Sequence, residues 1–297
     1  MIVSSTPLRI SFFGGGSDIP QYYNQKSGMV ISTTIDKKIQ IALNRCQTDH
    51  IRAVYSELEV VENIDNLKHD RIREALKMFQ IKNNLEICSF SDVPTKGTGL
   101  GSSSTFTVGL IKALYTMKVL LHNKKDLAES ACDIEIDKCN EPIGKQDQYA
   151  AAYGGFNVIR FDSTGVEVTP LNIGAHSLRT LNDNLMCYSS GISRNTSDIL
   201  SDQVKNILSD DQAFDSTSAL VDLAEQALKY FRANKIHDFG ALLNEAWRYK
   251  KKLSSKISNP DIDYMYESAL KAGALGGKLL GAGGGGYMLF YVPESAR

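Results

Sequence analysis

The sequence predicts an α+β protein with two domains. Its 297 residues, of which 42% are hydrophobic and 23% charged, are enough to bury a sizeable core and to form two domains. The first 60 or so residues have the composition of strands, whereas segments of helical periodicity dominate from about residue 195 onward. The pattern is interrupted at Gly174–Ser177, so we expect an N-terminal domain at 1–175 and a C-terminal domain at 176–297.

Runs of β-branched and aromatic residues predict the strands, and spacings of three and four between apolar residues predict the helices. Strands are expected at 8–13, 29–34, 39–44, 51–55, 85–90 and 287–292, with a hairpin at 156–161 and 166–170. A short helix is expected to start at Pro20 with Asp18 as part of its cap, and another at 127–139 with Asp126 as its N-cap. Further helices are expected at 71–79, 106–121, 199–208, 218–233, 239–253 and 262–272.

Charge and cysteine content exclude several classes of protein. The 33 Lys and Arg balance 34 Asp and Glu, so the chain has no general attraction for nucleic acid or for anionic membranes, and neither is expected as a partner. The first residues show no basic segment ahead of an apolar core, and no window approaches the roughly 18 apolar residues of a membrane span. Five scattered cysteines without a C-x-x-C pair suit a reducing compartment, so we expect a cytoplasmic protein.

The segment KGTGLGSSST, residues 96–105, follows a predicted strand and leads directly into a predicted helix. A helix N-terminus of this kind presents unpaired backbone N–H groups and the positive end of the helix dipole, and glycines let the backbone approach an anion closely. The segment therefore predicts a phosphate-binding loop, although a capped helix after a flexible turn would show the same residues. Its glycine spacing fits neither the Walker A motif nor the dinucleotide-binding fingerprint.

Three glycine-rich segments together resemble the motifs of the GHMP kinases, the family of galactokinase, homoserine kinase, mevalonate kinase and phosphomevalonate kinase. They are TPLRISFFGGGSD, PTKGTGLGSSS and KLLGAGGGGYMLF, in this order along the chain. The segments KGTGLGSSSTFTVGLIKALY and EPIGKQDQYAAAYGGFN are similar to those of the bacterial D-glycero-D-manno-heptose 7-phosphate kinase branch. Galactokinases carry an acidic residue and a histidine where Gly15 and Gly16 stand here, which argues for a different sugar.

The resemblance implies both a fold and a reaction. The fold is an N-terminal domain like domain 2 of ribosomal protein S5 and a ferredoxin-like α/β C-terminal domain. Relatives continue beyond the position of Val292 with a helix and another strand, so the second domain is expected to stop short of the usual family end. The implied reaction uses ATP and Mg²⁺ to phosphorylate the anomeric C1 hydroxyl of the heptose 7-phosphate. Its product, the 1,7-bisphosphate, would serve the synthesis of nucleotide-activated heptose for capsule, S-layer or lipopolysaccharide.

The resemblance also implies roles for individual residues. Asp147 would accept the proton of the sugar hydroxyl, Arg9 would steady the reacting groups, and Ser103 and Glu135 would hold Mg²⁺. Independently, Glu135 falls on a helix face with small, mostly apolar residues, where a carboxylate needs a partner. A purely structural role for the two carboxylates, as an N-cap or in a core ion pair, is the alternative. The ATP phosphates would be bound by Pro94, Gly97, Gly99, Leu100, Gly101, Ser102, Ser103 and Ser104.

For the sugar, the resemblance points to Asp18, nine residues after Arg9, and to the glycines before it, Gly14, Gly15 and Gly16. A sugar phosphate needs a positive site of its own. Ser193 and Arg194, just before a predicted helix, are the first candidates for it, and Lys145 and Lys250–Lys252 are weaker ones. The three lysines at 250–252 are expected on a solvated face, and the turn at 281–286 is expected to support the phosphate loop.

Two alternatives to heptose phosphate remain open at this stage. One is another GHMP sugar 1-kinase, for instance a fucokinase-like enzyme, whose unphosphorylated sugar would not need Arg194. The other is a non-catalytic sugar sensor on the same fold, against which the retention of Asp147, Glu135 and Ser103 argues. The expected partners are ATP and a small sugar phosphate. The anomer, the pathway and the oligomeric state, a homodimer included, stay open.

Overall fold

The structure is a computed structural model, and it describes residues 1–94, 97–193 and 196–297. It divides into two compact units, each of which combines helices with a sheet, so the predicted α+β class is confirmed. Strands β1 (Ile2–Phe13) and β2 (Gly28–Arg45) contribute to both units, so neither unit is one continuous stretch, and a domain boundary after residue 175 stays a prediction. Unit 1 comprises Met1–Arg9, Thr34–Lys96 and Gly101–Gly154, and unit 2 comprises Ile10–Thr33, Gly97–Leu100 and Gly155–Arg297.

The sheet of unit 1 uses the second half of β2. Its strand order is β4-β3-β5-β2. The other three strands are β4 (Leu58–Val61), β3 (Ile51–Val54) and β5 (Leu85–Ser91). Strand β5 pairs antiparallel with β2 and parallel with β3. The sequence predicts two strands where β2 is one strand of 18 residues. That prediction is wrong because the polar residues at 36–38 are exposed to solvent but keep the extended backbone of the strand. Lys38 N also donates a hydrogen bond to Asp92 Oδ2 at 2.8 Å, which stabilises this part of β2.

Four α-helices accompany this sheet: α2 (Asp70–Met78), α3 (Ser102–Met117), α4 (Lys124–Cys132) and α5 (Gln146–Tyr153). Helix α3 contacts the other three. The predicted N-cap of α4 is wrong, because Asn123 caps the helix. Asp126 occupies position N3 of a capping box, and its side chain accepts a hydrogen bond from Asn123 N. The predicted continuation to Cys139 is a π-helical segment, Asp133–Lys138. Helix α5 is missing from the sequence prediction.

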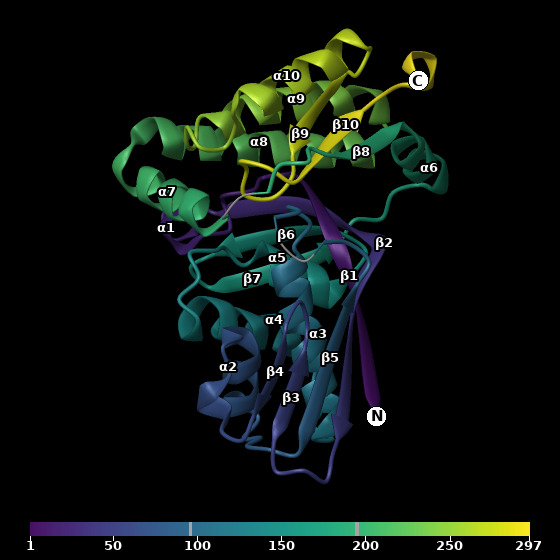
Figure 1. The fold of residues 1–297 in the computed structure, drawn as a ribbon. Helices are drawn as coiled ribbons and strands as arrows, with labels where there is room; N and C mark the ends of the chain where they lie inside the picture. Colours follow the sequence, from purple (N-terminus) through teal and green to yellow (C-terminus); the bar gives the residue numbers. More distant parts are fainter. Residues whose placement is uncertain (95–96, 194–195) are drawn as a thin grey trace. The chain divides into compact units, whose positions relative to one another are not determined.

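Unit 2 contains two sets of strands. The first half of β2 pairs antiparallel with β6 (Phe156–Asp162), which pairs antiparallel with β7 (Gly165–Pro170), and this confirms the predicted hairpin. A separate antiparallel sheet has the order β8-β10-β9, as Figure 1 shows. Its strands are β8 (Leu185–Ser189), β10 (Tyr287–Tyr291) and β9 (Gly276–Leu279).

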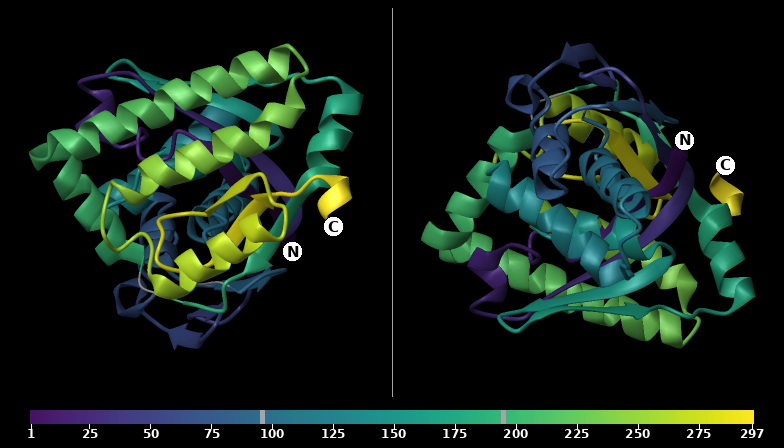
Figure 2. Two further views of the ribbon diagram at one scale, coloured as in Figure 1. Left: turned by 90° about the horizontal axis from the view of Figure 1, so that it is seen from above. Right: turned by 90° about the horizontal axis from the view of Figure 1, so that it is seen from below.

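Long helices cover this second sheet. Helix α8 packs along α9, and α9 lies against β9 and β10, so that the two helices run side by side (Figure 2). Phe12, Phe156 and Phe231 join Phe239 in an aromatic cluster with ring centroids 5.1 to 5.7 Å apart. Gly174, where the sequence predicts a break, is the N-cap of α6. The helices of unit 2 are α1 (Pro20–Tyr23), α6 (Ala175–Asn184), α7 (Thr196–Ser209), α8 (Asp211–Arg232), α9 (Phe239–Lys251) and α10 (Pro260–Lys271).

Candidate active site

The first turn of α3 is formed by the three serines of the predicted phosphate loop. The first backbone hydrogen bond of the helix is donated by Thr105 N to Gly101 O, at 2.9 Å. The N–H groups of Ser102, Ser103 and Ser104 therefore precede the intrahelical hydrogen bonds. Gly101 is the N-cap, and within the described residues no side chain caps the helix. Ser103 is exposed, whereas its two neighbours are buried. The positive end of the helix dipole therefore lies at these three serines, an arrangement that favours an anion.

Within unit 2, the loop residues Gly97–Leu100 pack against the third glycine-rich segment. A Cβ atom at Gly99, whose φ is +74°, would lie 2.4 Å from the backbone oxygen of Leu280, so only glycine fits there without a shift of the backbone. Tyr287 N donates to the backbone oxygen of Thr98 at 3.0 Å. A Cβ atom at Gly281 would likewise lie 2.4 Å from Gly99 Cα, so the turn at 281–286 packs against the loop, as predicted. Of the other loop residues, Leu100 is buried and Pro94, in unit 1, is exposed.

Arg9 and Asp147 form a bidentate ion pair in unit 1. Arg9 Nε donates to Asp147 Oδ1 at 2.7 Å, and Nη2 donates to Oδ2 at 2.6 Å. The Arg9 side chain is 4% exposed and that of Asp147 is 24% exposed, so water can still reach the carboxylate. A Cβ atom at Gly101 would lie 3.2 Å from Arg9 Cγ, which places the guanidinium stem directly beside the N-cap of α3. The ion pair therefore adjoins the helix start that can bind phosphate.

Glu135 lies in the π-helical segment and is fully buried. Its Oε2 accepts hydrogen bonds from Ser104 Oγ at 2.7 Å and from Gln148 Nε2 at 2.6 Å. Its Oε1 accepts from Thr107 Oγ1 at 2.8 Å and from Arg71 Nε at 3.0 Å. The partner that a buried carboxylate requires is thus present, and four donors surround its two oxygens.

Arg71 is shared between two carboxylates. Its Nη2 donates to Glu141 Oε1 at 2.8 Å while its Nε binds Glu135. Burial acts to lower the pKa of Arg71, but the negative charges of Glu135 and Glu141 outweigh burial and raise that pKa above its usual value. The guanidinium is therefore a permanent positive charge beside Glu135.

The donor set suits magnesium under one condition. Within residues 1–94, 97–193 and 196–297 no group of three or more His, Cys, Asp or Glu could hold a metal ion. Magnesium, however, is usually held by one or two carboxylates together with substrate phosphates and water. The Glu135 carboxylate and the exposed Ser103 hydroxyl are oxygen ligands of the kind it prefers. The condition is that one of the four donors gives up its place on Glu135.

The glycine segment predicted for the sugar lies in unit 2. A Cβ atom at Gly14, whose φ is +82°, would lie 1.7 Å from the backbone oxygen of Met29, so this turn packs tightly on β2. Asp18 is 2% exposed, and its Oδ1 accepts from Gly16 N at 3.1 Å. The prediction that Asp18 caps α1 is wrong, because the N-cap is Ile19 and no side chain bonds there. Gly15 and Gly16 are partly exposed.

The residues predicted for the sugar's phosphate are less well defined. Lys145 is the N-cap residue of α5 and is partly exposed, and Ser193 is exposed. Arg194 lies outside the described residues. Lys250 is 8% exposed and its Nζ donates to the backbone oxygens of Leu279 (3.1 Å) and Gly281, so the expectation of a solvated face is wrong for this lysine. Its buried ammonium holds the turn that supports the phosphate loop.

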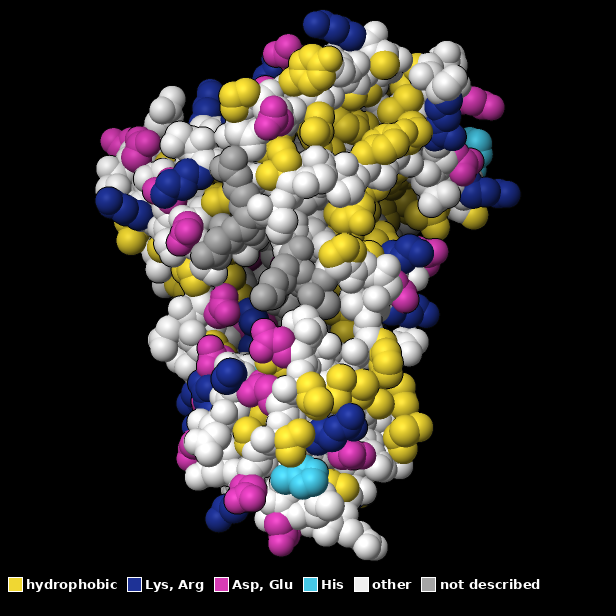
Figure 3. Space-filling view, in the orientation of Figure 1, with side chains coloured by type: hydrophobic (Ala, Val, Ile, Leu, Met, Phe, Trp, Pro, Cys, Tyr) yellow, Lys and Arg dark blue, Asp and Glu magenta, His cyan; other side chains and the backbone are white. Residues whose placement is uncertain are grey.

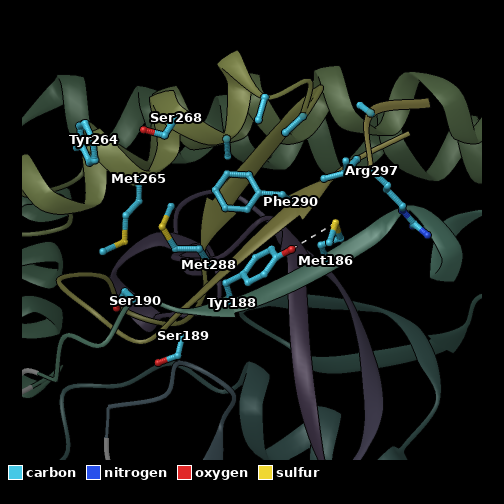
Figure 4. A pocket seen from close by; sticks show the side chains of 15 residues that line it. Met186, Tyr188, Ser189, Ser190, Tyr264, Met265, Ser268, Met288, Phe290 and Arg297 are labelled. Carbon is cyan, nitrogen blue, oxygen red and sulfur yellow. Dashed lines mark hydrogen bonds between the residues drawn. The ribbon is translucent and has the colours of Figure 1, made fainter. Parts of the chain in front are cut away.

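Unit 2 also contains an apolar cavity of about 490 Å³ between β8, β10 and α10 (Figure 4). Tyr188 and Met288 line it, and Tyr188 donates a weak hydrogen bond to Met186 Sδ at 3.6 Å. Apolar side chains also gather on the surface of this unit (Figure 3), where Tyr264 is 74% exposed. None of the site residues predicted from the sequence is among those lining the cavity.

Three residues of the site are missing from the sequence prediction: Arg71, Thr107 and Gln148. Thr107 follows Ser104 by three residues and Gln148 follows Asp147 directly, so helical geometry around the predicted residues offers a signal for both. Arg71 lies 64 positions before Glu135 and has no such signal.

A helix start that favours an anion, with an ion-paired carboxylate beside it, is an arrangement that suits a small-molecule kinase. Comparison with known proteins agrees. The profile described as the GHMP kinases N terminal domain matches residues 67–155, and that of the GHMP kinases C terminal matches residues 227–297. No helix in the described part of the chain has the length and apolar character to span a membrane.

Relatives and solved structures match over nearly the whole chain. A D-glycero-alpha-D-manno-heptose 7-phosphate kinase of Campylobacter jejuni is 33% identical over 100% of this chain and 91% of its own length. A bifunctional fucokinase/GDP-fucose pyrophosphorylase of Arabidopsis thaliana is 24% identical over 98% of this chain and 30% of its length. The crystal structure of a D-glycero-D-manno-heptose 1-phosphate kinase from Bacteroides thetaiotaomicron has a TM-score of 0.81 and 23% identity, covering 99% of this chain and 89% of that chain.

The chain therefore belongs to the GHMP kinases. It is an enzyme, a phosphotransferase of the sugar-kinase type.

Proposed function

We propose that this enzyme transfers the γ-phosphate of ATP to the anomeric C1 hydroxyl of D-glycero-D-manno-heptose 7-phosphate and releases the 1,7-bisphosphate and ADP. Similarity to the Campylobacter jejuni heptose 7-phosphate kinase, 33% identical along the full chain, supports the choice of substrate. A cytoplasmic location and a role in supplying nucleotide-activated heptose for capsule or lipopolysaccharide belong to the same proposal.

The observation that carries the proposed chemistry is the bidentate pair of Arg9 and Asp147 beside the N-cap of α3. The first turn of α3 offers N–H groups to the phosphates of ATP, and the carboxylate stands next to that turn. In-line phosphoryl transfer needs such a phosphate cradle together with a group that orients or deprotonates the attacking hydroxyl. Because Arg9 balances the charge of Asp147 while leaving it partly exposed, the carboxylate remains available to a substrate.

In the proposed step, the C1 oxygen forms a bond to the γ-phosphorus while the bond from that phosphorus to the β–γ bridging oxygen breaks. The hydroxyl proton passes to a carboxylate oxygen of Asp147, and ADP leaves with the electron pair of the broken bond. Glu135 and the Ser103 hydroxyl would hold the magnesium ion. When bound, magnesium neutralises negative charge on the phosphate oxygens. The sequence retains each of these groups, which favours an active kinase over a sugar sensor without activity.

Recognition of the sugar is proposed for residues of unit 2. Asp18, whose carboxylate is fixed by Gly16 N, would accept hydrogen bonds from ring hydroxyls, and the glycine turn before it would admit the ring close to the backbone. The 7-phosphate would be bound by Ser193 and Arg194, with Lys145 of unit 1 as the further candidate. Arginine before a helix N-terminus is suited to a phosphate because charge and N–H groups act together.

An ADP-release screen over sugars and sugar 7-phosphates, with NMR of the product, tests this proposal. The expected result is ADP release with heptose 7-phosphate and a new phosphorus resonance at C1. With heptose 1-phosphate included, the screen also decides between the two substrates named for the relatives, since one is called a 7-phosphate kinase and another a 1-phosphate kinase. ADP release with unphosphorylated sugars alone would overturn the proposed substrate.

The second candidate is a fucokinase-like sugar 1-kinase, which the 24% identity to the Arabidopsis thaliana enzyme favours. The variant Arg194→Ala separates the two. For heptose 7-phosphate we expect this variant to raise KM at least tenfold with little change in kcat, because a charged hydrogen bond to phosphate is lost. Arg179→Ala is the matched control, since this arginine is exposed on α6 and has no part in the proposed site. An unchanged KM in Arg194→Ala would remove the phosphate-site assignment.

A further inference from the structure

Gln148 stands out among the residues that surround the two carboxylates. It follows Asp147 in α5, it is fully buried, and its Nε2 donates to Glu135 Oε2 at 2.6 Å. Its Oε1 is also buried and has no hydrogen-bond partner among the described residues. The orientation of the amide is fixed by Glu135, because a rotated amide would bring one acceptor oxygen against another.

The four donors to Glu135 come from three helices. Ser104 and Thr107 belong to α3, and Arg71 belongs to α2 and also binds Glu141. Gln148 is the donor from α5, the helix that carries Asp147. Consecutive residues of a helix point about 100° apart, so Asp147 can bind Arg9 while its neighbour binds Glu135. One turn of α5 thereby holds both carboxylates.

The chemical character of the amide also matters. A neutral donor fixes the direction of a carboxylate without adding positive charge. The Arg71 guanidinium, by contrast, brings a positive charge that repels a metal cation. Such outer-shell donors orient the ligand, and their removal weakens metal binding although they do not touch the metal.

We infer that Gln148 is a positioning residue for phosphoryl transfer: it holds the Glu135 carboxylate in the orientation that a nucleotide-bound divalent cation requires and fixes that carboxylate relative to Asp147. The inference rests on the proposed function, in which Glu135 is a magnesium ligand. It adds a residue that acts through Glu135, and it makes α5 the common support of base and metal ligand.

The test is direct titration with Mn²⁺ in the presence of ADP, followed by electron paramagnetic resonance, on the full-length chain. Gln148→Leu removes the donor at similar volume, and we expect the Mn²⁺ dissociation constant to rise about tenfold, the lower end of the effect of losing an outer-shell partner. Affinity for ADP without metal should not change. The Mg²⁺ concentration for half-maximal ADP release from ATP should rise by the same factor.

Three further variants complete the experiment. Gln148→Met offers a flexible chain of similar length if the leucine variant does not fold. Gln226→Leu is the matched control, because Gln226 of α8 donates to Tyr230 Oη at 2.9 Å and has no part in the proposed site. Glu135→Gln tests the proposed metal ligand itself and should weaken Mn²⁺ binding more than either variant of Gln148.

The outcomes separate this inference from the proposed function. Weaker Mn²⁺ binding in Glu135→Gln but not in the Gln148 variants would overturn the positioning role and leave the metal ligand in place. Unchanged binding in Glu135→Gln would remove Glu135 as a ligand and the inference with it. A Gln148 variant that loses thermal stability while keeping its Mn²⁺ affinity would show that this amide is structural only.

Discussion

Replacement of Asp147 by asparagine is the most direct test of the proposed base. The carboxylate accepts two charge-assisted hydrogen bonds of 2.7 and 2.6 Å from Arg9. An amide can accept one of them, but its NH₂ group faces the other N–H. Breaking a buried ion pair costs about 3–5 kcal/mol, and because Asp147 is 24% exposed and water can replace part of the loss, we expect unfolding to become easier by about 2 kcal/mol.

The expected effect on catalysis is larger than the effect on stability. A positioned general base contributes roughly 10²–10⁴-fold, so turnover should fall at least about a hundredfold, which corresponds to about 2.7 kcal/mol in the activation free energy. ATP affinity should stay nearly intact, because the helix start that binds phosphate is unchanged.

The assay combines initial rates of ADP release at saturating ATP and sugar phosphate, calorimetry of ATP binding, and urea unfolding. Asp137→Asn, at an exposed aspartate of the same unit, is the control and should behave like wild type. Turnover close to wild type in Asp147→Asn would refute the assignment of Asp147 as base and leave it as part of a core ion pair.

Three further predictions concern loop packing, the buried ion pair and pH. Gly99→Ala should weaken ATP binding at least tenfold by calorimetry, because its Cβ would lie 2.4 Å from the backbone oxygen of Leu280. Gly191→Ala is the control, since Gly191 has a similar φ of +70° but open space around it. This control should lower only the free energy of unfolding, by about 1–2 kcal/mol. Equal ATP affinity in both would contradict this. Arg71→Met should lower the free energy of urea unfolding by about 3 kcal/mol, since the fully buried Glu135 loses its cation, and no loss would show that the neutral donors suffice. Burial first, and then the Arg71 charge, lower the pKa of His69 from 6.5 to about 4, so only the unfolded chain binds the proton between these values. Stability should therefore fall by about 2–3 kcal/mol as the pH drops from 6.5 to 4, and less in His69→Asn, which keeps an N-cap side chain for α2; parallel curves would exclude His69 as the cause.

The elements that the sequence predicts well are those with a strong local pattern. The hairpin of β6 and β7 and the long helices α8, α9 and α10 carry their periodicity within a single segment. The sequence does not predict helix α5 because its small residues, Ala150 to Ala152, show no alternation of polar and apolar character. Strand β2 is divided in the prediction because a polar stretch in the middle of a strand looks like a turn.

The candidate site is predictable only in part, for a related reason. The phosphate loop is a local signal, since glycines and serines precede one helix, and its geometry follows from that helix start. The partners of a buried carboxylate are not local. That Glu135 needs a donor follows from its burial, but that the donors are Arg71, Thr107 and Gln148 depends on the packing of α2, α3 and α5 around the π-helical segment. No single stretch of the sequence predicts this packing.

Most of the residues proposed for phosphoryl transfer lie in unit 1 and most of those proposed for the sugar lie in unit 2, although Gly97–Leu100 of the phosphate loop belong to unit 2 and Lys145 belongs to unit 1. Arg9, Asp147 and Glu135 belong to unit 1, together with the serines that start α3, whereas Asp18 and Ser193 belong to unit 2. A change confined to sugar recognition lowers binding of the ground state and transition state alike, so it raises KM and leaves kcat. A change at the transfer chemistry lowers kcat. Substitution of Asp18 by asparagine should therefore raise KM for the sugar while Mn²⁺ binding and ATP affinity stay at wild-type values. A fall in kcat without a change in KM would instead place Asp18 with the transfer chemistry.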